Sequence, residues 1–409
     1  MKILVICQYY YPEPFRITDI CEELEKRGNE VTVVTGLPNY PEGIIYKGYE
    51  NGEHRVEIIN GVQVYRVNTI PRKTGALYRF LNYYSYANSS TKFVKKLPDD
   101  FDVVFINQLS PVMMANAGIK YAKQHHKPCV LYCLDLWPVN LVAGGIKRDS
   151  VIYNHYRRVS KKIYTAVDKI LVTSKLFSDY FKNEFGIDKA KTGYLPQYAE
   201  EIFSDIPPKE PSDFCNLVFA GNIGKAQSVI TIVKAAEILK DEPVHFHIVG
   251  SGIELDNLKA YADEHNLANV TFYGRRPLEE MPSFYAMADA MLLTLEADPV
   301  ISMTLPGKLQ SYMAAGKPVI AAIDGEARRV IEMSDCGYCC SPEDEKALAN
   351  IIMLFRKGRF VNSFSRNAKR FYIEFFSKEA FFDKLQMGFS ILCDNNSLNN
   401  KGKRKNGKT

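Results

Sequence analysis

The 409-residue sequence lacks the residue patterns that mark several common classes of protein. Nine cysteines are present, but their closest group, Cys336, Cys339 and Cys340, has no second group to pair with and no histidine nearby. These cysteines therefore form no paired metal-binding set, and buried reduced thiols are the expected state. No G-x-x-x-x-G-K-[ST] motif supports a P-loop ATPase, and no G-x-G-x-x-G follows the first apolar run, where a dinucleotide-dependent oxidoreductase carries it.

Long apolar segments are also missing. The longest uncharged stretch, residues 103–119, contains asparagine, glutamine, serine and proline, so it does not predict a membrane-spanning helix. The apolar run at residues 1–7 stops at Gln8 and is too short for the core of a signal peptide. We expect a protein that is soluble or at most peripheral on a membrane.

Excess positive charge is scarce outside one end of the chain. The net charge is +5, and residues 394–409, with five lysine and arginine residues and one aspartate, contribute +4 of it. The nearly neutral remainder does not favour a nucleic-acid-binding surface over the whole protein. The tail is rich in asparagine, serine, lysine and glycine, so residues 394–409 are expected to be disordered.

Short apolar runs that suit β-strands alternate with segments of helical spacing. The clearest helical segment places Ile17, Ile20, Cys21 and Leu24 on one face and ends in a basic turn before Gly28. This alternation predicts parallel sheets built from βαβ units. The expected strands are residues 3–7, 31–35, 56–59, 62–67, 103–106, 129–134 and 170–173, followed by 217–220, 244–249, 270–273, 290–295 and 319–322.

A proline-containing linker, residues 204–216, separates the two halves of this pattern. We therefore predict an α/β protein of two doubly wound Rossmann-like lobes facing across a cleft, with ligands at the carboxyl ends of the strands. The first lobe spans residues 1–203 and the second spans residues 204–377. A C-terminal helix, residues 378–393, is expected to pack back towards the first lobe.

Four strand–helix junctions of the second lobe are candidate phosphate sites. A glycine-rich or proline-started loop at a helix N-terminus offers free backbone N–H groups and a partial positive charge. A glycine after a strand also suits an ordinary turn, so the prediction depends on the recurrence of such loops at one edge of one sheet. The candidates are Gly221, Asn222, Gly224, Lys225 and Gln227; Gly250 and Gly252; Gly274 and Arg275; and Ser302, Thr304, Leu305, Pro306, Gly307 and Lys308.

The matching edge of the first lobe carries a different set of side chains. Asp135 ends a very apolar strand close to the only tryptophan, Trp137. Desolvation there would raise the pKa of Asp135 and suit it to accept a proton, whereas an ordinary helix-capping role explains the same residue equally well. The other candidates at this edge are Tyr11, Glu13, Pro14, Arg16 and Gln108.

Several segments together carry a family resemblance. They are residues 9–14 (YYYPEP), 135–140 (DLWPVN), 195–200 (LPQYAE), 221–227 (GNIGKAQ), 250–252 (GSG), 305–308 (LPGK) and 312–319 (YMAAGKPV). In combination they resemble bacterial glycosyltransferase family 4, over residues 1 to about 390. The resemblance is strongest to the branch that adds amino sugars during O-antigen or capsule synthesis, similar to the L-fucosamine transferases.

The resemblance implies a fold, an activity and partners. It implies a GT-B fold, a nucleotide-sugar donor on the second lobe, expected to be a UDP-sugar, an acceptor on the first lobe, retention of the anomeric configuration, no cofactor and no obligatory metal. A polyprenyl-diphosphate-linked saccharide would be the acceptor, which implies a cytoplasmic protein at the inner face of the cytoplasmic membrane. Residues 72–97, where cations alternate with aromatic side chains, are the candidate contact with anionic lipid. The expected acceptor-binding residues are Tyr11, Glu13, Pro14, Arg16, Gln108 and Trp137.

The sequence departs from the family at the expected donor site. Two glutamates that stand eight residues apart in much of the family are replaced by Met303 and Ser311, so the usual sugar and ribose contacts cannot be assigned to carboxylates. Gln310, Glu296 and Asp298 are the candidate substitutes.

The remaining groups for the donor's diphosphate are cations and backbone. Lys225, Lys308 and the backbone of residues 304–307 would stabilise the leaving nucleotide diphosphate, because cations and helix N–H groups counter its developing charge. Arg275 would lie by the nucleotide base, mainly through backbone contacts.

Two other functions remain open from the sequence. A nucleotide-sugar epimerase shares the two-lobed fold, but it needs acid/base carboxylates and histidines in the cleft, and most of the seven histidines lie in or beside predicted strands. A nucleic-acid-binding protein would use the basic tail, whose five cations give only weak, salt-sensitive binding. We therefore expect no nucleic-acid partner.

Overall fold

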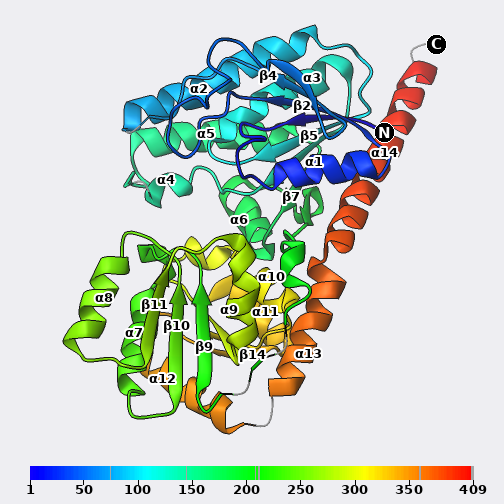
Figure 1. Ribbon diagram of the computed structural model, residues 1–409. Helices are drawn as coiled ribbons and strands as arrows, with labels where there is room; N and C mark the ends of the chain where they lie inside the picture. The colour runs from blue at the N-terminus through cyan, green and yellow to red at the C-terminus, as the bar shows by residue number, and fades with distance from the viewer. Residues whose placement is uncertain (74, 144, 208, 211, 359–360, 407–409) are drawn as a thin grey trace. The chain divides into compact units, whose positions relative to one another are not determined.

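The computed structural model describes residues 1–73, 75–143, 145–207, 209–210, 212–358 and 361–406. The chain forms two compact units, each with its own sheet (Figure 1). Unit 1 contains Met1–Thr173, Phe177–Leu195 and the chain from Lys384 onward, and unit 2 contains Ser174–Leu176 and Pro196–Asp383. The chain thus passes into unit 2 at Pro196, eight residues before the predicted boundary.

Unit 1 is built on an eight-stranded sheet with the order β3-β4-β2-β1-β5-β6-β7-β8. All neighbouring strands are parallel except the antiparallel pair β3 and β4. The strands are β1 (Lys2–Ile6), β2 (Glu30–Thr35), β3 (Val56–Ile59), β4 (Val62–Arg66), β5 (Val103–Gln108), β6 (Cys129–Cys133), β7 (Lys169–Val172) and β8 (Thr192–Tyr194). The helices that begin in this half of the chain are α1 (Ile17–Lys26), α2 (Ala76–Phe93), α3 (Asn116–His125), α4 (Asn140–Ala143), α5 (Val151–Ala166) and α6 (Lys175–Phe185).

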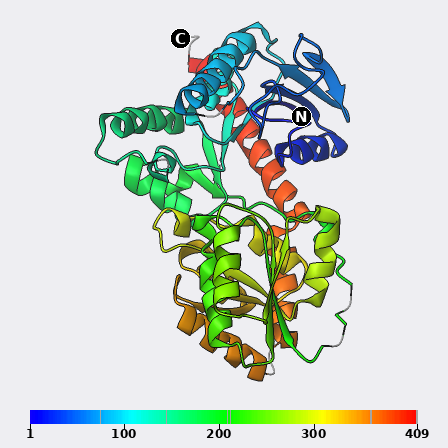
Figure 2. The same ribbon diagram turned by 60° about the vertical axis from the view of Figure 1, so that its left-hand side comes forward.

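Unit 2 is a six-stranded, wholly parallel sheet with the order β11-β10-β9-β12-β13-β14. Figure 2 shows its helices on both sides of the sheet. The strands are β9 (Cys215–Ala220), β10 (Val244–Val249), β11 (Val270–Gly274), β12 (Ala290–Thr294), β13 (Val319–Ala322) and β14 (Gly337–Cys340). The helices are α7 (Val229–Ile238), α8 (Leu255–Glu264), α9 (Met281–Met287), α10 (Gly307–Ala314), α11 (Gly325–Ser334), α12 (Glu345–Lys357) and α13 (Val361–Phe371), followed by the π-helical turn Tyr372–Phe376.

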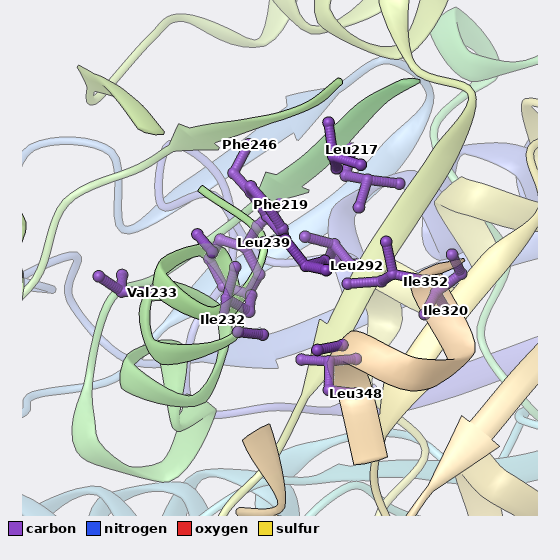
Figure 3. Packing of buried hydrophobic residues seen from close by; sticks show 14 of the residues in the cluster. Leu217, Phe219, Ile232, Val233, Leu239, Phe246, Leu292, Ile320, Leu348 and Ile352 are labelled. Carbon is purple, nitrogen blue, oxygen red and sulfur yellow. The ribbon is translucent and has the colours of Figure 1, made fainter. Parts of the chain in front are cut away.

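Apolar packing holds each helix layer to its sheet. In unit 2, Phe219 and Leu292 from the strands meet Ile232 of α7 and Ile352 of α12, and all four are buried (Figure 3). Complete burial of a side chain of this kind contributes about 1.5–3 kcal/mol. In unit 1 the helical stripe predicted in α1 is buried at all four positions. The prediction of an α/β fold of two doubly wound units is confirmed.

The C-terminal helix α14 (Lys378–Asn406) enters unit 1 from Lys384. The Phe389 ring lies 5.5 Å from the Phe105 ring, edge to face, and the Asn396 amide donates to the His126 carbonyl oxygen at 2.8 Å. The structure is helical as far as Asn406, which corrects the expectation of disorder for residues 394–406, and residues 407–409 of that segment lie outside the described residues. A helix that is already formed extends at little cost, which residue composition alone does not reveal.

The topology of each sheet indicates where a ligand is expected. Strand order reverses between β1 and β5 in unit 1 and between β9 and β12 in unit 2. Ligands of such sheets bind outside the carboxyl ends of the strands at this reversal. The loops that follow these four strands contain most of the residues singled out from the sequence.

Candidate functional sites at the carboxyl ends of both sheets

The loops after β9 and β10 in unit 2 lie in close backbone contact. The N–H of Gly221 donates to the Val249 carbonyl oxygen, and the N–H of Ile223 donates to the Ser251 carbonyl oxygen, both at 2.9 Å. A Cβ atom at Gly250 would overlap the Gly221 carbonyl oxygen, and one at Gly252 would overlap the Ile223 carbonyl oxygen. Only glycine fits at these two positions, so this edge of the sheet presents main chain rather than side chains.

Lys308 points its ammonium group at this glycine loop. The nitrogen lies 4.1 Å from the centre of the Phe219 ring and 3.0 Å from where a Gly221 Cβ would stand. It is buried and, among the described residues, has neither a hydrogen-bond partner nor a carboxylate in ion-pair range. Burial lowers the pKa of Lys308 to about 7. An unpaired buried cation is costly, which makes this group exceptional among the predicted site residues.

Helix α10 holds Lys308 in place. Pro306 precedes the helix in an extended conformation, and the phenol of Tyr312 accepts from the Ala220 N–H and donates to the Ala220 carbonyl oxygen. These bonds attach α10 to the end of β9. The first turn of a helix leaves backbone N–H groups without partners inside the helix, and in α10 that turn includes Gly307 and Lys308.

The residues considered as substitutes for the missing glutamates make local bonds. The Gln310 amide, oriented to satisfy its neighbours, donates to the Pro306 and Gly307 carbonyl oxygens at 2.9 and 3.1 Å. One carboxylate oxygen of Asp298 accepts from the N–H groups of Val300 and Ile301. Both side chains therefore stabilise nearby main chain through hydrogen bonds.

Polar side chains in the loop after β9 also form hydrogen bonds within that loop. The side-chain oxygen of Gln227 accepts hydrogen bonds from the Asn222 side-chain amide at 3.1 Å and from the Gly224 N–H at 3.2 Å. Lys225 is 79% exposed, and its ammonium lies 3.8 Å from a carboxylate oxygen of Glu296. Unlike Lys308, Lys225 is exposed to solvent and has a carboxylate within ion-pair distance.

The other predicted phosphate loops are also at this edge. The N–H of Gly250 donates to the Gly274 carbonyl oxygen at 2.9 Å, which brings the β11 end alongside, and Arg275 there is exposed. The hydroxyl of Thr304 donates to Ile301, and that of Ser302 donates to Pro299. Leu305, which precedes Pro306, is buried.

Sequence reasoning missed a buried carboxylate in unit 2. Glu326, in the first turn of α11 after β13, is fully buried and forms an ion pair with Arg329. A Cβ at the preceding Gly325 would overlap the Ser302 carbonyl oxygen, so this turn contacts the loop before α10. The only signal in the sequence was the glycine after a short apolar run.

In unit 1, Asp135 is anchored to the loop after β5. One oxygen of its carboxylate accepts from both the N–H and the hydroxyl of Ser110 at 2.9 Å, and the Trp137 indole N–H donates to the same hydroxyl at 2.8 Å. Burial raises the pKa of Asp135, and the hydrogen bonds from Ser110 and Asn140 oppose that rise. The carboxylate thus lies in a partly dry, hydrogen-bonded setting.

Gln108 and Glu13 were both predicted to contact the acceptor. In the structure both side chains are buried and form hydrogen bonds to main-chain groups. The Gln108 amide donates to the carbonyl oxygens of Leu109 and Asp135, at 2.9 and 3.0 Å. Glu13 accepts from the N–H groups of Asn39 and Tyr40, both at 2.8 Å, and burial raises its pKa to about 7. Both side chains connect loops at the carboxyl edge.

The remaining predicted residues lie nearer to solvent. Tyr11 is 48% exposed and Pro14 is exposed, whereas Arg16 is partly exposed where α1 begins.

Sequence reasoning missed a buried polar pair in unit 1. Gln8 follows β1 and Asn82 lies in α2, and their buried side chains share a 2.7 Å hydrogen bond.

Histidines and acidic groups offer little for other chemistry. His247 lies within β10 and bonds Tyr273 and Asn216, and His245 bonds Thr271. In the part of the chain that the structure describes, no group of three or more His, Cys, Asp or Glu side chains could hold a metal ion.

No helix among the described residues is both long and apolar enough to cross a membrane.

Comparisons with known proteins agree with this architecture. The family model "Glycosyltransferase Family 4" matches residues 16–197, and "Glycosyl transferases group 1" matches residues 203–371. WbjE of Pseudomonas aeruginosa, assigned as a glycosyltransferase, is 32% identical over 237 residues, which are 54% of this chain and 58% of WbjE. The colanic acid biosynthesis glycosyl transferase WcaI of Escherichia coli is 24% identical over 372 residues, 85% of this chain and 90% of WcaI.

A solved structure supports the fold. HepE of Anabaena, in complex with UDP and glucose, superposes with a TM-score of 0.67 at 17% identity, covering 95% of this chain and 99% of HepE. The two family matches fall on the two units in turn, and both sheets have the doubly wound order expected of GT-B proteins. The chain therefore belongs to the glycosyltransferases, as a member with family 4 and group 1 domains and the GT-B fold.

Proposed function

We propose that this protein is a retaining glycosyltransferase of bacterial surface polysaccharide synthesis. Its donor is a nucleotide diphosphate sugar, a UDP-sugar carrying an N-acetylated amino sugar, and its acceptor is a polyprenyl-diphosphate-linked saccharide. WcaI, named for colanic acid biosynthesis, supports the pathway, and HepE, solved with UDP and glucose, supports the donor class.

Lys308 is the observation that carries the donor assignment. A protein gains nothing in stability from a buried, unpaired cation, so its retention at the glycine loop favours a ligand that brings negative charge. A diphosphate on the Gly221 and Gly250 main chain would pair with this ammonium. The N–H groups at the start of α10 would add further donors.

These groups also suit the chemistry of transfer. As the bond between the sugar and the diphosphate breaks, negative charge grows on the leaving nucleotide, and a preorganised cation stabilises that charge more than it stabilises the bound donor. In this proposal Lys308 supplies most of the positive charge and the exposed Lys225 adds a smaller share, so no metal is obligatory. Asp135 of unit 1 is the proposed proton acceptor for the acceptor hydroxyl, since its raised pKa strengthens it as a base.

Peripheral contact with the inner face of the cytoplasmic membrane is part of the proposal. Leu77, Phe80 and Leu81 of α2 and Val151 and Ile152 of α5 are exposed apolar side chains. Not all of the segment predicted from sequence is available, because Tyr86 is fully buried and donates to the Cys7 carbonyl oxygen. The contact surface is therefore the first turns of the two helices, where exposed Lys73 and Arg79 favour anionic lipid.

A panel of nucleotide sugars tests the donor assignment. The melting temperature is measured with UDP-, GDP-, dTDP- and CMP-sugars for the wild type, for Lys308→Met and for the control Lys346→Met, which changes an exposed lysine of α12. A ligand at about 100 times its Kd adds roughly 2.7 kcal/mol to stability, so one nucleotide class should raise the melting temperature of the wild type and the control. Equal stabilisation of Lys308→Met would contradict the assignment.

A further inference from the structure

Two exposed tyrosines in the loops after β1 and β2 have main chain that is held by buried charged groups. The carboxylate of Glu13 accepts from the Tyr40 N–H at 2.8 Å, and the guanidinium of Arg66 donates to the Tyr11 carbonyl oxygen at 2.7 Å. Both charged side chains are buried. Burial of a charge costs free energy that hydrogen bonds only partly offset. The structure therefore bears a cost to fix main chain that carries exposed rings.

Tyr40 is the more firmly held of the two. The carbonyl oxygen of Tyr40 accepts from the Tyr46 phenol at 2.6 Å, so both of its main-chain polar groups are bonded. Its ring lies 5.8 Å from the Tyr9 ring and 5.2 Å from the Phe15 ring, which are stacked on each other at 4.8 Å. Tyr40 is nevertheless 36% exposed. It thus presents a fixed aromatic ring to solvent.

A fixed, exposed aromatic ring suits one class of ligand. The face of an aromatic ring is negative, and the C–H groups on one side of a sugar ring carry partial positive charge. A sugar therefore stacks on such a ring without any charge of its own.

Two buried side-chain oxygens at the same edge of the sheet lack donors. β1 and β5 are neighbouring parallel strands, with Ile6 beside Ile106, so Gln8 and Asn107 lie at their carboxyl ends. Both residues are buried, and within the described chain neither Gln8 Oε1 nor Asn107 Oδ1 has a hydrogen-bond partner. A buried acceptor without a donor is costly. Sugar hydroxyl groups would supply the missing donors, directly or through water.

Tyr40 lies several strands away from the proposed proton acceptor. Tyr40 follows β2 and Asp135 follows β6, and the order β2-β1-β5-β6 places three strand spacings, about 14 Å, between the two strands. Gln8 and Asn107 belong to the two strands in between. A single sugar ring whose hydroxyl reaches Asp135 does not span this distance.

We infer that Tyr40 determines acceptor specificity, because its ring stacks on a sugar of the acceptor beyond the one that carries the reacting hydroxyl. The inference rests on the proposed function and narrows the acceptor to a chain of at least two sugars. The reacting sugar lies at Asp135, and the next sugars run past Gln8 and Asn107 to Tyr40. An acceptor of one sugar does not reach the Tyr40 ring and binds weakly.

A saccharide array tests this inference with the full-length protein. The labelled protein is applied to immobilised bacterial and synthetic saccharides of one to six sugars, and calorimetry then measures the Kd of the saccharide that binds best. The wild type should bind at least one saccharide of two or more sugars, and its terminal monosaccharide at least about tenfold more weakly, since the stacked ring is missing. Absence of binding to every saccharide, or equal affinity for the monosaccharide, would overturn the inference.

Variants of Tyr40 separate stacking from folding. Tyr40→Ala should weaken binding of the best saccharide about tenfold and raise its KM as acceptor with little change in kcat, because only binding is lost. Tyr40→Trp keeps an aromatic face and should retain the affinity. The control Phe214→Ala removes an exposed ring just before β9 and should change nothing. Unchanged affinity in Tyr40→Ala, or an equal loss in Tyr40→Trp, would contradict the role of Tyr40.

Stabilisation by UDP, measured in parallel, distinguishes this inference from the proposed function. UDP should raise the melting temperature of the wild type, Tyr40→Ala and Phe214→Ala alike. Loss of this stabilisation in the wild type counts against the donor site, whereas saccharide binding that does not depend on Tyr40 counts against the inference alone.

Discussion

The two units share a parallel, doubly wound topology but present different chemistry at the carboxyl ends of their sheets. In unit 2 the edge is glycine main chain facing the ammonium of Lys308, which has no partner in the part of the chain that the structure describes. In unit 1 the edge is filled by side chains that already bond one another, such as Asp135 with Ser110 and Gln8 with Asn82. On the proposed function, one type of sheet thus serves two kinds of recognition.

On the proposed function, the difference follows from the part of each substrate that lies at the sheet edge, which is the donor's diphosphate in unit 2 and the acceptor's sugar hydroxyl in unit 1. A diphosphate brings concentrated negative charge and is met by main-chain N–H groups and a cation that stays unpaired until it arrives. A sugar hydroxyl is neutral and needs hydrogen-bonding groups in fixed positions, which a satisfied network provides. On this comparison, unit 2 bears the electrostatic cost of burying the Lys308 ammonium, whereas unit 1 has the rigid network of hydrogen-bonded side chains.

The largest expected effect separates activity from stability in unit 2. Lys308→Met should lower kcat/KM by about 10²–10³, the size of a lost charge-stabilising group. The free energy of unfolding should stay the same or rise, because a buried unpaired charge is removed. Since the pKa of Lys308 is lowered from 10.5 to about 7, the buried amine is charged, and most costly, below about pH 7. The stability gain should therefore be greatest there and shrink as the pH rises towards 10.5.

Turnover assays and urea unfolding check this prediction, with Lys346→Met as the control. A parallel loss of activity and stability in Lys308→Met would mean that the lysine is a structural element and that the contrast between the units is wrong.

A smaller effect is expected in unit 1. Asp135→Asn keeps the size of the side chain but cannot accept a proton, so kcat should fall about 10²-fold, at the lower end of general-base contributions. Ser110→Ala removes a hydrogen bond that opposes the pKa rise, so the pH at which the activity of that variant rises should move upward. Rate profiles over pH measure both. An unchanged kcat in Asp135→Asn would return this residue to a purely structural role.

Lys225 should matter little although it lies in the same loop region. It is exposed and has Glu296 within 3.8 Å, and exposed pairs contribute about 0.2–1 kcal/mol. Lys225→Gln should therefore reduce donor affinity only a few-fold, and added salt should reduce the difference. Donor titrations at low and high salt test this, and a loss as large as that of Lys308→Met would contradict it.

The smallest expected signal is proton uptake on donor binding. At about pH 8, a group with a pKa of about 7 is roughly nine-tenths neutral, and a bound diphosphate favours its charged form. UDP binding should then take up close to one proton and weaken as the pH rises above about 7. Calorimetry in two buffers of different ionisation enthalpy detects this uptake. Equal binding enthalpies in both buffers would show that Lys308 does not change its protonation.

The sequence predicted the parts that depend on local chemistry. The loops at Gly221, Gly250 and Pro306 were predicted because glycine and proline requirements are set by the backbone itself. The strands β8 and β14 were missed, since the first has only three residues and three of the four residues of the second are only partly buried. Both were too weakly apolar to stand out.

Contacts between distant segments could not be predicted. That Lys308 would be buried beside Phe219 depends on how α10 attaches to β9, which Tyr312 determines across 92 residues of sequence. Gln108 and Glu13 were expected to face a substrate, yet both bond the main chain of neighbouring loops. Residue type and position along a strand do not reveal which polar groups are already satisfied.

Calorimetric titration with UDP of the wild type, Lys308→Met and Arg79→Glu tests the division between the units most directly. The account predicts one UDP per chain in the wild type, unchanged affinity in Arg79→Glu, and affinity at least about 30-fold weaker in Lys308→Met, in line with the loss of a buried charge-assisted pair. UDP affinity that is unchanged in Lys308→Met, or lost in Arg79→Glu, would contradict it.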